Sequence, residues 1–176
     1  MDTNSNHELS APSAWVLRFA DRVPVKGSVL DVACGSGRHA RLFAARGNPV
    51  DAVDRDATLF TDIPENVNFV CADIETGAEG AWPFAGRHYG GVIVTNYLHR
   101  PLLPMLIDAV APGGILIYET FAKGNERFGK PSNPDFLLRH GELIDAVKGR
   151  LRVIAYEDIH TETPKPAMVQ RIAAVR

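Results

Sequence analysis

Short apolar runs recur along the chain and alternate with segments whose apolar residues follow helical spacing. The runs cover residues 29–33, 50–53, 67–72, 91–95 and 115–120. Runs of this length without polar alternation are typical of strands buried in a parallel sheet. Their alternation with helical segments predicts an α/β protein with a doubly wound, mostly parallel sheet.

The end of the chain departs from this alternation. Residues 151–156 and 168–175 are predicted strands, and a polar connection that contains prolines joins them. Two successive strands without an intervening helix must pair antiparallel if they are neighbours. The chain therefore predicts a seven-stranded sheet with a C-terminal antiparallel hairpin.

Helices are predicted from apolar spacing together with their start and stop signals. The stretch from Ser10 to Ser13 predicts the start of the first helix, and we expect Trp15 and Phe19 on one of its faces to pack against the sheet. The remaining helices are predicted over 38–46, 102–110 and 135–147.

Length and composition narrow the class of protein. The 176 residues fit one domain, predicted over 9–176, and residues 1–8 are expected to be disordered. A formal net charge of −2 gives no global indication of nonspecific nucleic-acid binding. The N-terminus lacks the pattern of a signal peptide, and no apolar run approaches the roughly 20 residues that span a bilayer. We therefore expect a cytoplasmic protein without membrane association.

The cysteines and histidines give no indication of a metal or disulfide framework. Cys34 and Cys71 lie far apart in the sequence and have no Cys or His at ligand spacing near them. The sequence predicts no metal site.

The segment from Asp31 to Gly37 joins the first strand to a helix. Its glycines allow a ligand to approach the backbone closely, and the helix N-terminus supplies unpaired N–H groups. Gly35-x-Gly37-x-x-Ala40 fits the dinucleotide pattern G-x-G-x-x-G/A, although that match alone is weak. Asp31 instead favours a ligand with a cationic amine, because a carboxylate repels a pyrophosphate. The alternative is a tight turn that binds nothing.

Asp54 follows the second strand, at the position where α/β sites place an acid for ribose hydroxyls. This position indicates a ligand that contains a ribose, but it does not distinguish a dinucleotide from a ligand with a cationic amine. The alternative interpretation of Asp54 is the N-cap of a helix over 57–60.

Asp31-x-Ala33-x-Gly35-x-Gly37 resembles the first motif of class I S-adenosylmethionine (SAM)-dependent methyltransferases, E/D-x-G-x-G-x-G, with Ala33 at the first glycine. Further matches are an acid after the second and third strands, a polar segment after the fourth, a Pro-Gly-Gly turn before the fifth and the terminal hairpin. The likeness runs from about residue 30 to the C-terminus. Within the superfamily the chain is similar to the small tellurite-resistance-type methyltransferases, which have little beyond the core.

This resemblance implies SAM as the cofactor and S-adenosylhomocysteine (SAH) as the product. It implies that Asp31 and the glycine turn lie near the methionine amine, that Asp54 binds the ribose, and that Asp73 and Ile74 hold the adenine. The residues assigned to cofactor contact are Asp31, Ala33, Gly35, Gly37, Asp54, Arg55, Asp73, Ile74, Asn96 and Tyr97.

The residues after the fourth strand should face the methyl group, because ligands sit at the carboxyl ends of strands in open α/β sheets. A protein base is needed only if the acceptor carries a proton that must leave. His99 is the first candidate for this base, and Tyr97, Tyr118 and Glu119 are alternatives. His99 is equally well interpreted as a histidine at a helix start.

Residues 121–134, from Phe121 to Pro134, form a predicted irregular loop rich in glycine and proline. The loop carries Lys123, Arg127 and Lys130, and it contains one acid. We expect it to be a lid that faces an anionic substrate. The alternative is a solvated charged loop.

The leading hypothesis is a methyltransferase for a small-molecule acceptor, anionic or a soft nucleophile, that works as a monomer or homodimer without nucleic acid. The absence of an appended recognition domain favours a small acceptor. Alternatives are a methyltransferase that modifies RNA or protein with a partner, and a module that binds SAM or SAH without turnover. An NAD-dependent oxidoreductase is disfavoured by Asp31, the terminal hairpin and the missing substrate domain.

Overall fold

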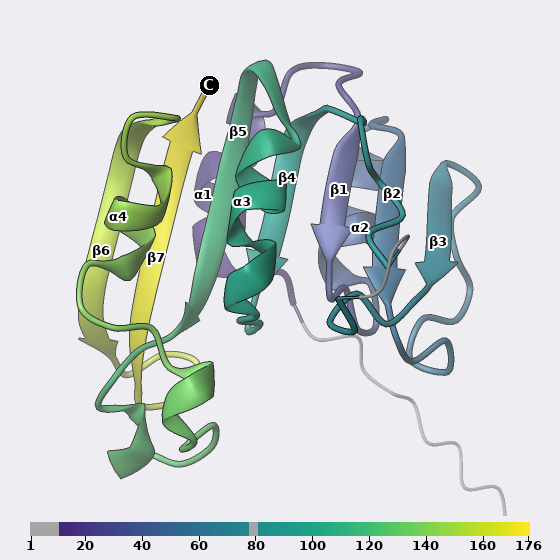
Figure 1. Cartoon of the computed structure of the whole chain (residues 1–176). Helices are drawn as coiled ribbons and strands as arrows, with labels where there is room; N and C mark the ends of the chain where they lie inside the picture. Colours follow the sequence, from purple (N-terminus) through teal and green to yellow (C-terminus); the bar gives the residue numbers. More distant parts are fainter. Residues whose placement is uncertain (1–10, 78–80) are drawn as a thin grey trace, which may run out of the picture.

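The computed structural model describes residues 11–77 and 81–176, and the expectation of disorder over 1–8 lies outside them. Its centre is a seven-stranded sheet with the strand order β3-β2-β1-β4-β5-β7-β6 (Figure 1). The first five strands are parallel, whereas β7 pairs antiparallel with both β5 and β6. The predicted doubly wound sheet with a C-terminal antiparallel hairpin is confirmed.

The strands lie close to the predicted apolar runs. They are β1 (Val29–Val32), β2 (Val50–Asp54), β3 (Val67–Cys71), β4 (Tyr89–Thr95), β5 (Val110–Phe121), β6 (Arg152–Thr161) and β7 (Ala167–Val175). β5 begins earlier than its apolar run, because Val110 already pairs with Tyr89 of β4. The Pro-Gly-Gly turn therefore lies inside β5, where Gly113 has a φ of +75°.

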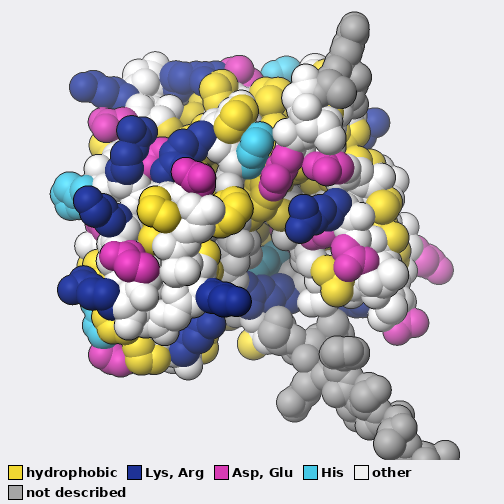
Figure 2. All heavy atoms as spheres, turned by 60° about the horizontal axis from the view of Figure 1, so that its bottom comes forward, with side chains coloured by type: hydrophobic (Ala, Val, Ile, Leu, Met, Phe, Trp, Pro, Cys, Tyr) yellow, Lys and Arg dark blue, Asp and Glu magenta, His cyan; other side chains and the backbone are white. Residues whose placement is uncertain are grey.

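The carboxyl ends of the parallel strands meet at one edge of the sheet, at the bottom of Figure 1. Residues 121–141, called the cap segment below, leave β5 at this edge and lie under β6 and β7. Figure 2 turns the same edge forward and shows Lys and Arg side chains gathered on the side of β6 and β7. The topology therefore places both the glycine turn and the cap segment at the ligand-binding edge of the fold.

The helices are short. They are α1 (Ala14–Phe19), α2 (Arg38–Ala45), α3 (Leu103–Asp108) and α4 (Glu142–Val147), with 3₁₀ turns η1 (Ala20–Arg22), η2 (Arg100–Leu102), η3 (Asn125–Arg127) and η4 (Pro134–Phe136). None of the helices within the described residues is long and apolar enough to cross a membrane.

The predicted helix over 135–147 is wrong in its first half. Leu138 forms an isolated parallel bridge with Ala122, and its N–H donates to the carbonyl of Phe121 at 3.0 Å. Gly141, at a φ of +74°, then starts α4. The apolar spacing was helical, but pairing with a distant segment overrides that local preference.

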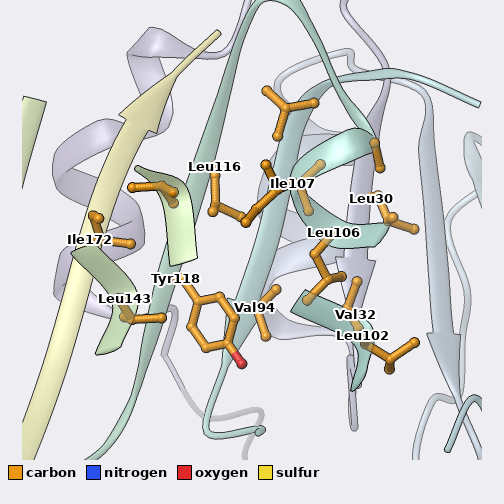
Figure 3. Packing of buried hydrophobic residues seen from close by; sticks show 14 of the residues in the cluster. Leu30, Val32, Val94, Leu102, Leu106, Ile107, Leu116, Tyr118, Leu143 and Ile172 are labelled. Carbon is orange, nitrogen blue, oxygen red and sulfur yellow. The ribbon is translucent and has the colours of Figure 1, made fainter. Parts of the chain in front are cut away.

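Apolar side chains pack on both faces of the sheet. On one face, residues of α3 and α4 such as Leu106 and Leu143 contact β-strand residues such as Leu116 (Figure 3). On the other face α1 and α2 pack, and Trp15 is only 2% exposed. Its indole N–H donates to the carbonyl of Ile172 at 3.2 Å, so the expected packing of α1 against the sheet is confirmed.

Candidate active site

A cavity of about 330 Å³ lies at the carboxyl ends of β1, β2 and β3. Its volume falls in the range of about 300–1,000 Å³ that is typical of small-molecule sites. Six residues assigned to the cofactor from sequence line it, namely Ala33, Asp54, Arg55, Asp73, Ile74 and Tyr97. The other four assigned residues, Asp31, Gly35, Gly37 and Asn96, do not line it.

The turn between β1 and α2 is built from left-handed backbone. Ala33, Gly35 and Gly37 have φ values of +52°, +53° and +76°. A Cβ on Gly37 would lie 2.4 Å from the ring of Phe60, so this position requires glycine for space as well as for conformation. Ala33 occupies the place of the motif's first glycine and adopts the same conformation, so the departure from the motif leaves the turn intact.

Asp31 lies beneath the turn. Its side chain is 1% exposed, and its Oδ2 accepts a hydrogen bond from the N–H of Ala40 at 2.9 Å. This bond joins β1 to the first turns of α2. Burial raises the pKa of Asp31 from the ordinary 3.8 to about 7. Its expected contact with a ligand amine stays a prediction.

The raised pKa of Asp31 predicts a pH-dependent stability. A carboxyl group with a higher pKa in the folded protein binds more protons there, so stability falls as pH rises from about 4 to about 7. Asp31→Asn keeps an oxygen for the Ala40 N–H but cannot ionise. Between about pH 4 and pH 7, we expect the free energy of unfolding of this variant to rise relative to the wild type by about 1.4 kcal/mol per pH unit. Urea unfolding at pH 5 and pH 8 measures this gain, and a difference that does not change with pH would contradict it.

Asp54 is the last residue of β2 and lines the cavity beside the turn between β1 and α2. Its Oδ2 accepts from the N–H of Gly35 at 2.8 Å, and its Oδ1 accepts from the N–H of Asp56 at 3.0 Å. Residues 57–60 form no helix, so the alternative N-cap role is wrong. The carboxylate is held in a fixed orientation beside the glycine turn.

Asp73, Ile74 and Tyr97 form the far side of the cavity. The Oδ1 of Asp73 accepts from the N–H of Glu75 at 3.0 Å, and Ile74 is 8% exposed. The hydroxyl of Tyr97 is buried and has no hydrogen-bond partner among the described residues. Burial and the neighbouring Glu75 raise the pKa of Tyr97, so the phenol is neutral and can donate.

The cavity lining is strongly acidic. Four carboxylates, those of Asp54, Asp56, Asp73 and Glu75, face one guanidinium, that of Arg55. Sequence reasoning did not assign Asp56 or Glu75 to the site, although each lies two residues after an assigned aspartate. This excess of negative charge opposes a phosphorylated ligand.

Two of the candidate bases are engaged elsewhere in the fold. Tyr118 is 1% exposed, and its hydroxyl donates to the carbonyl of Tyr97 at 2.8 Å. Glu119 accepts from the hydroxyl of Ser13 at 2.6 Å and forms an ion pair with Arg171 at 3.0 Å. Neither side chain lines the cavity.

His99 lies in the turn after β4 and is half-buried. Its backbone carbonyl accepts from the N–H of Leu102 at 3.0 Å, which starts η2. The imidazole ring has no hydrogen-bond partner within 11–77 and 81–176. It remains the candidate base, and that role stays a prediction.

Residues 121–134 of the cap segment are irregular, as predicted. Lys123, Arg127 and Lys130 are exposed, and the Nε of Arg127 donates to the carbonyl of Gly124 at 3.3 Å. No ion pair joins any of these three cations to an acid in the described part of the chain. Because Asn96 N–H donates to the carbonyl of Glu119, the cap leaves the sheet next to the turn that carries His99.

Sequence reasoning missed an ion pair that joins this turn to the start of α4, directly after the cap segment. Arg100 contacts Glu142 at 2.7 Å, and Glu142 is also bonded to Arg139. The pair is separated by 42 residues, so no local pattern could have indicated it.

The chain has a Rossmann-like methyltransferase fold, and comparison with known proteins agrees. The family model described as "Methyltransferase domain" matches residues 29–114. A trans-aconitate 2-methyltransferase of Paracidovorax citrulli is 32% identical over 108 residues, which cover 54% of this chain and 40% of that protein. The chain thus spans less than half the length of this curated relative.

Solved structures share the fold. TehB from Haemophilus influenzae has a TM-score of 0.78 at 17% identity, covering 97% of this chain and 64% of that one. A TehB-like SAM-dependent methyltransferase from Corynebacterium glutamicum has a TM-score of 0.65 at 14% identity, covering 92% and 86%. The glycopeptide N-methyltransferase MtfA, solved with SAM, has a TM-score of 0.63 at 17% identity, covering 99% of each chain. The resemblance to class I SAM-dependent methyltransferases seen in the sequence is therefore confirmed.

Proposed function

We propose that this protein transfers the methyl group of SAM to a small anionic acceptor. The observation that carries the proposal is the cavity at the ends of β1–β3, where four carboxylates face one guanidinium. SAM carries an ammonium and a sulfonium against one carboxylate, and it has no phosphate. Two unit charges about 4 Å apart have an interaction energy of about 4 kcal/mol at an effective dielectric constant of about 20. The acidic lining therefore favours the cationic groups of SAM over the phosphates of a dinucleotide.

The residues of the cavity fit the parts of SAM. Asp54 offers a fixed carboxylate for the ribose hydroxyls, because the turn holds its orientation through the N–H of Gly35. Asp73 can accept from the adenine amino group, and Ile74 offers an apolar surface beside the ring. The unpartnered hydroxyl of Tyr97 is a hydrogen-bond donor for the same ligand.

The chain contributes mainly orientation. SAM, when bound, supplies a methyl group on a sulfonium, and transfer breaks the carbon–sulfur bond while the sulfur keeps the electron pair. Holding the acceptor in line with that bond contributes up to about 7–11 kcal/mol by proximity. Where the acceptor atom carries a proton, His99 receives it, since a neutral imidazole has a ring nitrogen that can accept one.

The cap segment supports an anionic acceptor. Lys123, Arg127 and Lys130 are exposed cations without an ion-pair partner among the described residues, and they belong to the segment that leaves β5 at the carboxyl-end edge of the sheet. The relative from Paracidovorax citrulli is named for a methyl transfer to trans-aconitate. Trans-aconitate is therefore the first acceptor to test.

Calorimetric titration with SAM, SAH and NAD tests the cofactor. We expect SAM and SAH to bind and NAD not to bind, and binding of NAD alone would overturn the proposal. Transfer of labelled methyl from SAM to trans-aconitate and to a panel of small carboxylates then tests the activity. Binding of both sulfur nucleotides without transfer to any acceptor would favour a module that binds SAM without turnover.

A further inference from the structure

The side chain of Arg100 joins the turn after β4 to the cap segment. Its Nε and Nη2 donate to the two carboxylate oxygens of Glu142 at 2.7 and 3.0 Å. Its Nη1 donates to the carbonyl of Asp135 at 2.7 Å, and its Nη2 donates to that of Leu137 at 2.9 Å. One planar guanidinium thus holds two backbone carbonyls of the cap and the first residue of α4. Lysine cannot reproduce this fork.

Glu142 is committed to this arrangement. Its side chain is 8% exposed, and its Oε2 also accepts from the N–H of Arg139 at 2.8 Å. Burial would raise the pKa of Glu142, but hydrogen bonds from Arg100 and Arg139 lower it to about 2. The carboxylate is therefore charged at neutral pH, where it can pair with Arg100.

The other end of the same turn lies in the cofactor cavity. Tyr97 lines the cavity with its side chain, and its backbone carbonyl accepts the hydroxyl of Tyr118 at 2.8 Å. Asn96, just before it, adopts a φ of +54°, which non-glycine residues rarely adopt. Residues 96–100 are thus a short turn with one end in the cavity and the other bonded to the cap.

We propose that Arg100 is a positioning residue that couples the cap segment to the cofactor cavity, so that binding of the cofactor orders the wall that faces the acceptor. This inference rests on the proposed function. Cofactor contact with Tyr97 restrains residues 96–100, and the bonds of Arg100 to Glu142, Asp135 and Leu137 carry that restraint into the cap. By linkage, a cap held by an acceptor strengthens cofactor binding to the same extent.

Hydrogen exchange of the cap amides, measured with and without SAH, tests the coupling. The amides to follow are those of Lys123 and Leu138, which bond across the base of the cap. In the wild type we expect SAH to slow their exchange by about fivefold or more. In Arg100→Gln we expect SAH still to bind, while this slowing is lost. In Glu142→Gln the slowing should be reduced but not lost, because the bonds of Arg100 to the carbonyls of Asp135 and Leu137 remain. The double variant should lose no more than Arg100→Gln, because that change already removes the pair with Glu142.

Controls separate this role from a loss of folding. Arg87→Gln removes the 3.0 Å ion pair of Arg87 with Asp51, neither of which lines the cavity, and should keep the full SAH response. Arg100→Lys keeps the charge and serves if Arg100→Gln does not fold, and its SAH response should be reduced. With any acceptor found active, Arg100→Lys should raise the KM for the acceptor, and the acceptor should strengthen SAM binding less than it does in the wild type.

The outcomes distinguish this inference from the proposed function. Equal slowing by SAH in the wild type and in the Arg100 variants would overturn the coupling, as would SAH binding that leaves the wild-type cap unaffected. A wild type that does not bind SAH would remove the proposed function itself.

Discussion

Gly37→Ala should destabilise the protein more than the same change at Gly35. Both glycines have positive φ, which costs an alanine about 1–2 kcal/mol. A Cβ at Gly35 would meet nothing within 4 Å, whereas one at Gly37 would lie 2.4 Å from the ring of Phe60. Overpacking of this kind adds about 1–3 kcal/mol. Urea unfolding of the two variants measures the difference directly.

Phe60 cannot move aside easily. It is 3% exposed, packs edge-on against Phe69 at 5.6 Å between ring centroids, and lies under the guanidinium of Arg41. Replacing it by leucine in the Gly37→Ala background should therefore recover part of the lost stability. Equal destabilisation by alanine at Gly35 and at Gly37 would show that the contact with Phe60 is not limiting.

Asp54→Ala should weaken SAM binding by about tenfold or more, because a charge-assisted hydrogen bond contributes about 1.5–3 kcal/mol. The change removes the carboxylate that faces the cavity and also frees the N–H of Gly35, so the glycine turn loses its restraint. Calorimetric titration with SAM measures the affinity, and circular dichroism confirms that the variant is folded.

A second aspartate on the same strand provides the matched control. Asp51 accepts from the hydroxyl of Tyr89 at 2.6 Å and does not line the cavity. Asp51→Asn should therefore leave SAM affinity unchanged. If folded Asp54→Ala bound SAM as tightly as Asp51→Asn, Asp54 would not belong to the cofactor site.

The parallel strands could be predicted because burial on both faces leaves a clear apolar run in the sequence. β1 is buried at all four positions, and its run ends where the glycine turn begins. Two of the four acids that line the cavity, Asp54 and Asp73, could also be predicted, because they lie at the ends of strands whose carboxyl ends meet at one edge.

What could not be predicted depends on contacts between distant residues. Leu137 and Leu138 fit a helical pattern but are buried beside the end of β5, where Leu138 pairs with Ala122. Likewise, Tyr118 and Glu119 were placed correctly at the end of a strand, but their partners, Tyr97 and Arg171, come from other parts of the chain. Local sequence patterns carry no information about such pairings.

The position of β7 has a consequence for synthesis on the ribosome. β6 lies at the end of the sheet and pairs only with β7. β7 is synthesised after β6 and also pairs with β5. Until residues 167–175 have emerged, β5 and β6 both present open edges that can pair with other chains. Chaperone dependence of the nascent chain should therefore end when this last strand is released.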